Sequence, residues 1–443
     1  MSIQDERTAR YARTLQKMIQ HETVSSGAAE GDIKFRSFRA LMKDLFPHLF
    51  ALSEVTEFES GIVLKWQGSD ADKEPVLFMN HHDVVAADGE WSHAPFSGDI
   101  AEGRLWGRGT LDDKGGLWAM LQASDELAEE GFMPGRTIWF ESSSTEETTG
   151  RGADEISRWF LDKGIRFKMC FDEGGVILHE PIPGADADFA LIGVGEKGCA
   201  DIKFTARSNG GHASIPEKDS PLVRLGRFMA EADKHHIFKA YMDDAVCEML
   251  RVFAPCCDGV KARFMSEPEK HKGLLTRKLL SASPKTAAML RTTISFTMAQ
   301  GSKGKNIIPS EAWVIGNMRY SHHQGRDASI EAVRKLAARY DIETEVLDPG
   351  QPSDITDYRG EAYRLVAEAV KTVFPGTVPA PYIMTGASDS RFFRRVCNQC
   401  ICFLPFKIDD AQLNSIHAAD ENISLGSLAP AVDFYRCLMK GSQ

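Results

Sequence analysis

The sequence lacks the features of a membrane or nucleic-acid-binding protein. No apolar run in its 443 residues approaches the ~20 residues that a helix needs to span a bilayer. The first seven residues are polar and lack the apolar core of a signal peptide. The formal net charge is -11 and the acidic residues are scattered, which argues against nucleic acid or an anionic membrane as the main partner. We therefore expect a cytoplasmic protein with no nucleic-acid and no membrane partner.

Cysteines are few and do not form a disulfide framework. The chain has 9 cysteines, an odd number at uneven spacing. Cys397, Cys400 and Cys402 form a Cys-x-x-Cys-x-Cys cluster. A zinc site built from cysteines alone needs a second Cys-x-x-Cys pair, and the sequence has none. We interpret the cluster as buried thiols in a strand, with a redox or metal role as the alternative.

The length and composition are those of a globular protein with more than one core. A chain of 443 residues is longer than one ordinary core accommodates. Hydrophobic residues make up 43% and charged residues 26%, which is the usual balance of a folded protein. The sequence contains no internal repeat and no low-complexity segment. Two domains, or one domain with a large insertion, are therefore expected.

Strands and helices alternate in the first part of the chain and again near its end. This order predicts an α/β fold with a central, mostly parallel sheet. The period of the apolar residues distinguishes the strands from the helices. The expected elements are strands at 76–79, 136–140 and 167–171, a helix around 117–127, and, after Pro352, a helix at 362–373 and a strand at 401–404.

The middle of the chain has a different order, which is β-α-β-β-α-β. That order is the ferredoxin-like plan. We expect its elements at 199–206, 221–233, 292–298, 312–320, 328–340 and 342–347. The piece at 235–284 contains helical stretches and is interpreted as an elaboration of this module. We predict a catalytic domain formed by residues 1–198 and 351–443, interrupted by a lid domain at 199–350.

Five short segments concentrate side chains that bind metals, and each lies at or near the end of an expected strand. They contain His81, Asp112, Glu146-Glu147, Asp172-Glu173 and His417. In open α/β sheets the carboxyl ends of the strands form the ligand crevice. Imidazole and carboxylate ligands together suit zinc. Two histidines with three carboxylates exceed the needs of one catalytic zinc and fit two zinc ions that share a bridging carboxylate.

Each segment also has an ordinary structural explanation. Asp112-Asp113 suits a helix cap, Glu146-Glu147 suits a solvated turn, and a single histidine such as His417 is more often a surface or core residue. The occurrence of five such segments at strand ends favours a metal site over these separate explanations.

A Gly-x-Gly-x-x-Gly pattern at Gly193, Gly195 and Gly198 resembles a dinucleotide-binding fingerprint. Such a fingerprint follows a strand and opens a helix. The residues after Gly198 are strand-like instead, so we reject nucleotide binding.

Longer stretches around the five segments carry a family resemblance. They include Asp83-Val-Val, Leu105-Trp-Gly-Arg-Gly-Thr-Leu-Asp-Asp-Lys, Gly211-His-Ala-Ser-Ile-Pro, Asn306-Ile-Ile-Pro and Ser388-Asp-Ser-Arg. The chain resembles the co-catalytic zinc aminoacylase/carboxypeptidase family, and within it the carboxypeptidase S and N-acyl-amino-acid hydrolase branch. The resemblance covers almost the whole chain, in order. It implies a zinc-peptidase catalytic domain with an inserted ferredoxin-like lid and dimerisation domain.

The resemblance also implies a role for each candidate residue. Asp83 would orient His81, and Asp172 would be the less favoured ligand of its pair. Glu146 would be the general base. The five ligands of two zinc ions would be Asp112 as the bridge, His81 with Glu173 at one ion, and Glu147 with His417 at the other.

Further implied residues serve the substrate. His212 would reach into the active site of a partner subunit. Asn306 and Arg319 would contact the substrate carboxylate, to which an arginine fork is well suited. Gly386 would present its backbone to the substrate.

The implied activity is hydrolysis of an amide bond next to a free carboxylate. Substrates would be dipeptides, short peptide C-termini or N-acyl amino acids, and the enzyme would be a homodimer with two zinc ions per subunit, replaceable by manganese or cobalt. Departures from the family pattern at Ala86, Thr145, Ala387-Ser388 and Ala418 affect no implied ligand and bear on substrate preference. The alternative is a binding protein of this fold that has lost catalysis.

Overall fold

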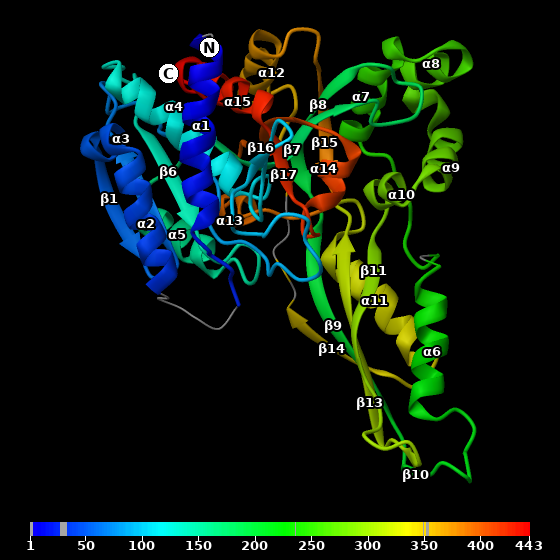
Figure 1. Ribbon diagram of the computed structural model, residues 1–443. Coiled ribbons are helices and arrows are strands. Elements are labelled where there is room, and N and C mark those ends of the chain that lie inside the picture. The colour runs from blue at the N-terminus through cyan, green and yellow to red at the C-terminus, as the bar shows by residue number, and fades with distance from the viewer. Residues whose placement is uncertain (1–2, 27–32, 235, 349, 351–353) are drawn as a thin grey trace.

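The structure is a computed structural model that describes residues 3–26, 33–234, 236–348, 350 and 354–443. Figure 1 shows a larger domain, which holds both chain ends, and a small domain that projects from it. In the described part of the chain, no helix has the length and apolar character needed to cross a bilayer.

A mixed sheet of eight strands forms the centre of the larger domain. Its order is β1-β2-β6-β3-β7-β16-β8-β15. The central strands β6, β3, β7 and β16 run parallel, whereas β1 and β2 at one edge are antiparallel. The strands are β1 (Ser53–Phe58), β2 (Gly61–Trp66), β3 (Val76–Met79), β6 (Ile138–Ser143), β7 (Met169–His179), β8 (Asp188–Glu196), β15 (Val378–Met384) and β16 (Cys400–Ile408). The predicted α/β class with a mostly parallel central sheet is confirmed.

Helices cover both faces of this sheet because its central strands are apolar on both sides. Val76 and Phe78 belong to one buried cluster, while Leu77 and Met79 belong to another, as the alternation of a strand requires. The first face packs against α1 (Ile3–Gln20), α4 (Lys114–Glu129), α12 (Glu361–Val373) and α15 (Leu425–Gly441). The second packs against α5 (Arg151–Asp162) and α13 (Ser390–Phe393).

The small domain has its own sheet and its own core. Its antiparallel sheet has the order β11-β13-β9-β14, and α6 and α11 pack on it around Phe204 and Phe228. This order is the one expected for the ferredoxin-like plan. The elements are β9 (Gly198–Arg207), α6 (Pro221–Ala232), β11 (Thr293–Gln300), β13 (Glu311–Tyr320), α11 (Gly325–Ala338) and β14 (Glu343–Asp348).

The helices between α6 and β11 pack differently from the prediction. They are α7 (Asp244–Phe253), α8 (Gly259–Ser266), α9 (Lys272–Ala282) and α10 (Pro284–Leu290). Val246, Leu250 and Phe253 belong to the buried cluster of the larger sheet, and the Phe253 ring lies 4.2 Å from that of Phe189 on β8. The interpretation of 235–284 as an elaboration of the small module is therefore wrong, because its apolar side chains find their partners on the larger sheet.

The proposed domain limits remain predictions. The limit at 350/351 and the resumption of the α/β order after Pro352 adjoin residues 351–353, which lie outside the described residues, as does His235 at the start of the 235–284 piece.

A second correction to the predictions concerns the length of β7. We expected Asp172-Glu173 to follow a strand, but β7 continues through them to His179.

Candidate metal centre and substrate pocket

Two histidines share one carboxylate at the carboxyl ends of the central strands. Asp112 Oδ1 lies 3.2 Å from His81 Nε2, and Asp112 Oδ2 lies 3.0 Å from His417 Nε2. Glu147 Oε2 lies 3.1 Å from the same His417 nitrogen. His81 comes two residues after β3, whereas Asp112 immediately precedes the turn into α4. The fold thus brings together four residues that the sequence analysis selected as metal ligands.

Asp83 fixes both His81 and the Glu146-Glu147 turn. Its Oδ1 lies 3.3 Å from His81 Nδ1, which is the ring nitrogen opposite the one beside Asp112. Both carboxylate oxygens also accept backbone hydrogen bonds, from Glu146 at 3.2 Å and from Glu147 at 3.1 Å. One fully buried carboxylate therefore sets the relative position of a candidate ligand and the candidate base.

Glu421 organises the loop that carries Asp112, and the sequence analysis gave it no role. Its carboxylate accepts backbone hydrogen bonds from Leu111 at 2.7 Å and Asp112 at 3.1 Å. The Arg108 guanidinium donates to it at 2.6 Å, and both side chains are buried. Arg108 lies within a segment quoted for the family resemblance and Glu421 lies four residues after His417, but only the tertiary contact reveals that they act as a pair.

Glu146 lies beside Arg391, another residue without an assigned role in the sequence analysis. Arg391 Nη1 lies 3.6 Å from Glu146 Oε1. Burial raises the pKa of Glu146 well above its ordinary value, and the charge of Arg391 acts against this rise. A carboxylate with a raised pKa is suited to accept and return a proton near neutral pH.

Asp172 and Glu173 have different surroundings. Asp172 is held by backbone donors, from Glu173 at 2.9 Å and from Ser390 at 2.7 Å. Glu173 instead lines a pocket together with Asp112, Glu146, Glu147 and His417. Glu173 is therefore the member of the pair that faces the cluster.

The cluster has the donor set and the electrostatics that a divalent cation requires. Glu147 Oε1 is buried and has no hydrogen-bond partner among the described residues. Hydrogen bonds that His417 donates to the carboxylates of Asp112 and Glu147 raise the pKa of His417 to about 10, which reflects the strong negative potential at this point. Burial raises the pKa of Glu173 and Glu147. Imidazole and carboxylate donors under this potential fit zinc.

The backbone at His417 has an unusual conformation. Its φ is 61°, in the left-handed region that residues other than glycine rarely adopt and that is enriched at functional sites. The side chain is 53% exposed, so this candidate ligand faces the solvent-accessible side of the cluster.

Two adjoining pockets open from the cluster, and they contain two of the predicted substrate residues. One is lined by Glu146, Glu147 and His417 on the larger domain and by Arg319 on β13 of the small domain. Gly386, in the turn after β15, lines both pockets. Arg319 is thus placed across a cleft from the cluster, where it can meet an anionic group.

His212 and Asn306 lie elsewhere. His212 is on the short strand β10 (Gly211–His212), which pairs with β12 (Ile307–Ile308) directly after Asn306. This strand pair is at the far end of the small domain, away from the pocket (Figure 1). His212 is exposed, and its Nδ1 contacts Ser214 Oγ at 2.7 Å. Within one chain the structure does not bring these two residues to the cluster.

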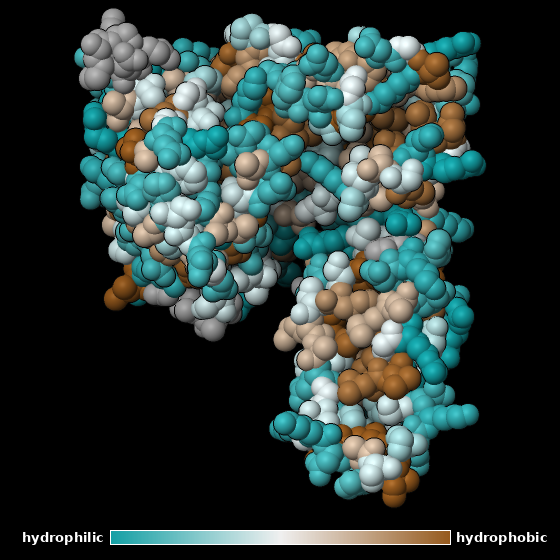
Figure 2. All heavy atoms as spheres, turned by 45° about the vertical axis from the view of Figure 1, so that its right-hand side comes forward, coloured by the Kyte–Doolittle hydropathy of each residue, from teal (hydrophilic) through white to brown (hydrophobic). Residues whose placement is uncertain are grey.

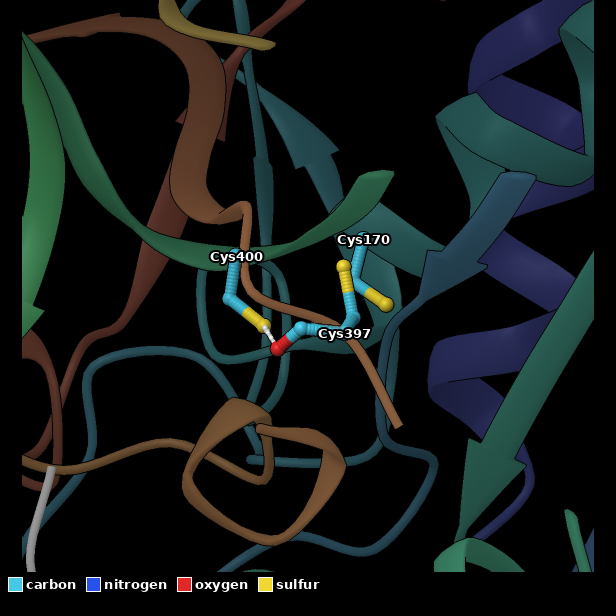
Figure 3. A group of neighbouring side chains, drawn as sticks. All are labelled: Cys170, Cys397 and Cys400. Atoms are coloured by element: carbon cyan, nitrogen blue, oxygen red, sulfur yellow. Dashed lines mark hydrogen bonds between the residues drawn. The ribbon is translucent and has the colours of Figure 1, made fainter. Parts of the chain in front are cut away.

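Two other sequence patterns have clear outcomes. The Gly-x-Gly-x-x-Gly segment spans the end of β8 and the start of β9, so no helix begins after it. Cys397, Cys400 and Cys402 are buried, and the last two lie on β16, as expected. Cys170 on β7 joins Cys397 and Cys400 (Figure 3), a juxtaposition that the sequence does not reveal.

Comparisons with known proteins identify the family of this chain. The model of peptidase family M20/M25/M40 matches residues 77–441. A Dictyostelium discoideum protein named "Probable carboxypeptidase S-like 2" is 28% identical over 98% of this chain and 85% of its own length. The human N-fatty-acyl-amino acid synthase/hydrolase PM20D1 is 30% identical over 95% of this chain and 85% of its own.

A solved structure shares the fold. The metallo-carboxypeptidase Sso-CP2 of Sulfolobus solfataricus superposes with a TM-score of 0.72 over 99% of both chains, at 18% identity. With the family match covering most of the chain and the acidic histidine-containing cluster lying inside it, this protein is an enzyme of peptidase family M20/M25/M40, a family of metallopeptidases and amidohydrolases.

Proposed function

We propose that the protein is a dinuclear zinc hydrolase that cleaves an amide bond next to a free carboxylate. The observation that supports this most strongly is Asp112, whose two oxygens each contact a different histidine. A carboxylate in that position suits a bridge between two ions. His81 and Glu173 would hold one ion, and His417 and Glu147 the other. When bound, zinc lowers the pKa of a water molecule to roughly 7 and polarises the scissile carbonyl.

The residues of the chain supply the proton transfer and the orientation of the substrate. Glu146 takes a proton from the attacking water and returns it to the leaving amine. Arg391 holds Glu146 in place and favours its ionised form before the reaction. Arg319 pairs with the substrate carboxylate across the cleft, and Gly386 lets the substrate approach the backbone.

We further propose that the enzyme works in the cytoplasm as a homodimer joined through the small domain. Figure 2 shows apolar side chains on the visible face of this domain. Its exposed apolar residues include Ile215 at 78%, Met298 at 57% and Ile307 at 54%, and β11 is an edge strand. Exposed apolar surface of this kind marks an interaction site. In such a dimer, His212 of one copy would complete the site of the other as an oxyanion donor.

Among the possible substrates, the pocket favours N-acyl amino acids with an apolar acyl chain. Val176, Phe406 and Leu413 line the pocket beside the cluster. Leu413 also lines a cavity of about 850 Å³, and Leu178, on the same face of β7 as Val176, lies there too. Most of the other apolar residues that line this cavity belong to α7, α8 and α9. They are Leu250, Phe264, Leu274, Leu275 and Leu279. The helices at 244–290 would thus form an acyl-chain site.

Initial rates on matched substrates test both parts of the proposal. Substrates with a free carboxylate should be cleaved, and their C-terminal amides should not. Arg319→Ala should raise KM for the acids. Leu413→Trp should reduce kcat/KM for long-chain N-acyl amino acids tenfold or more and leave N-acetyl substrates largely unchanged, whereas Leu161→Trp, on the surface of α5, should affect neither. Equal cleavage of the amides would contradict the carboxylate requirement, and an equal loss for both chain lengths would contradict the acyl site.

A further inference from the structure

Three buried cysteines outside the catalytic pocket bring their sulfur atoms together. Cys170 on β7 and Cys400 on β16 are register partners across a parallel strand pair, and Cys397 lies in the turn before β16. All three Sγ atoms lie within 4.8 Å of one another. Figure 3 shows the side chains converging, with Cys400 Sγ also 3.7 Å from the carbonyl oxygen of Cys397.

The size of this sulfur triangle suits a small cation at its centre. A metal–thiolate bond of about 2.3 Å places the sulfurs of a three-coordinate site roughly 4 Å apart. No two of the three Sγ atoms are more than 4.8 Å apart, so the triangle is compatible with that size. Because two of the three ligands are anchored on paired strands of the central sheet, little rearrangement is needed to bind an ion.

The surroundings select a soft cation that accepts three ligands. Cys170 and Cys400 are 0% exposed and Cys397 is 3% exposed. They pack among Phe160, Phe167 and Phe393, and within the described residues no histidine or carboxylate joins the group as a fourth ligand. Magnesium and calcium prefer oxygen ligands, and structural zinc takes four ligands. Thiolates select copper(I) among the common alternatives.

The local charge favours a thiolate centre. Cys397 Sγ accepts a hydrogen bond from the backbone N–H of Gln399 at 3.3 Å. The charge of the Arg394 guanidinium also acts on the Cys397 sulfur. Nε and Nη2 of Arg394 are buried and have no hydrogen-bond partner among the described residues. This guanidinium offsets part of the negative charge that a thiolate-bound monovalent cation retains.

We propose that Cys170, Cys397 and Cys400 form a three-coordinate site for a soft monovalent cation of the copper(I) class. The three sulfurs bind the ion as thiolates, any thiol proton is released to the solvent, and no atom changes its oxidation state. The site is separate from the zinc centre, which offers only nitrogen and oxygen donors. A disulfide between two of the cysteines would destroy the ligand set, so it is the competing outcome that the experiment must detect.

The test is a competition titration of zinc-loaded, fully reduced protein under anaerobic conditions. Copper(I) is supplied as its complex with bicinchoninate, a coloured competitor, and its transfer is followed by absorbance. We expect one equivalent to move to each chain, with a cuprous-thiolate band in the near ultraviolet. Cys397→Ala and Cys170→Ser should weaken binding at least 100-fold. Cys247→Ser, which changes a cysteine buried elsewhere, should bind copper as the original protein does.

A second measurement keeps the proposal testable if a cluster variant fails to fold. Copper(I) should protect Cys170, Cys397 and Cys400 of the unaltered protein from alkylation, as located by peptide mass spectrometry. The proposal is overturned if folded protein takes no copper from the competitor, or if Cys247→Ser loses binding equally. A disulfide within the cluster, combined with no copper uptake after reduction, would overturn it in favour of a redox role.

Discussion

Asp112 and Glu146 are the two residues on which the proposed chemistry depends most. The first contacts both histidines of the cluster, and the second is a buried carboxylate whose backbone is fixed by Asp83. A ligand and a base have different signatures when they are altered. Loss of the ligand removes metal, whereas loss of the base leaves metal bound and slows turnover.

Glu146→Gln should separate these roles. The amide keeps the shape of the side chain but cannot accept the proton, so kcat should fall roughly 10²–10⁴-fold, while bound zinc is unchanged. Elemental analysis and initial rates on one preparation measure both quantities. Glu129→Gln, on the exposed end of α4, serves as the control. Near-normal turnover of Glu146→Gln would remove Glu146 as the base.

His322 should contribute a pH dependence of folding stability below neutrality. Burial lowers the pKa of His322 from 6.5 to about 4, and its Nε2 is buried with no hydrogen-bond partner among the described residues. Between these pH values the unfolded chain binds a proton that the folded chain does not, so the free energy of unfolding falls as pH falls. The loss should approach roughly 3 kcal/mol.

Denaturant unfolding at several pH values checks this prediction. In His322→Gln the contribution of this residue to the fall in the free energy of unfolding between pH 6.5 and 4 should disappear, whereas the contributions of other groups should remain. If the free energy of unfolding of the variant depends on pH as it does in the original protein, His322 is not the group responsible.

At the scale of elements, the loop between β5 (Arg104–Trp106) and α4 positions one residue of the candidate metal site. It carries Asp112, and its backbone donates to the carboxylate of Glu421, which in turn binds Arg108. A buried ion pair is costly to break because the remaining charge stays unpaired. The loop therefore depends on a residue far along the chain.

Glu421→Ala should lower both stability and metal affinity. Removing one partner of a buried pair costs about 3–5 kcal/mol, and Asp112 loses the contact that holds its backbone. Chemical denaturation and zinc competition with a chelator measure the two effects. The exposed pair of Arg207 and Glu343 gives the control, since Glu343→Ala removes a surface contact of small energetic value. Unchanged zinc affinity in a folded Glu421→Ala protein would contradict this role.

The sequence predicted elements well where local periodicity decides them. Four strands of the larger sheet, which are β3, β6, β7 and β16, and the ferredoxin-like order follow from alternating and continuous apolar runs, whereas β1, β2, β8 and β15 were not predicted. The packing of α7–α10 could not be predicted, because an amphipathic helix shows that it has a partner but not which one. The length of β7 was also missed, since Asp172 and Glu173 are polar residues inside a strand.

The sequence allowed us to predict the members of the candidate cluster, but not all of the residues that hold them in position. The ligand candidates His81, Asp112, Glu147 and His417 meet as expected. Arg391 and Glu421 act through contacts between distant segments, which spacing in the sequence does not reveal. The same reason explains why Cys170 was not linked to Cys397 and Cys400.

At the scale of the whole molecule, the role that we propose for His212 requires an assembly. It lies at the tip of the small domain (Figure 1), so within one chain it is remote from the proposed chemistry. A second copy would have to bring it to the cluster, and the exposed apolar surface of the small domain is where we propose that the copies meet.

Mixing two inactive variants tests that arrangement. His212→Ala and Glu146→Gln should each be nearly inactive alone. If His212 acts across a dimer, a mixture that has exchanged subunits should regain part of the activity, because one of the two sites in a mixed dimer has both residues. Differently tagged copies and native mass spectrometry confirm the exchange. No recovery despite confirmed exchange would place the action of His212 within its own chain.

We propose above all that this protein is an amide hydrolase that uses two zinc ions and requires a free carboxylate on its substrate. The most direct test measures zinc content and hydrolysis of an N-acyl amino acid on the same sample during stepwise reloading of chelator-treated protein. Activity should rise to a plateau at about two zinc ions per chain, and the C-terminal amide should not be cleaved. Full activity without metal, or two bound zinc ions with no cleavage of any N-acyl amino acid or dipeptide, would contradict this proposal.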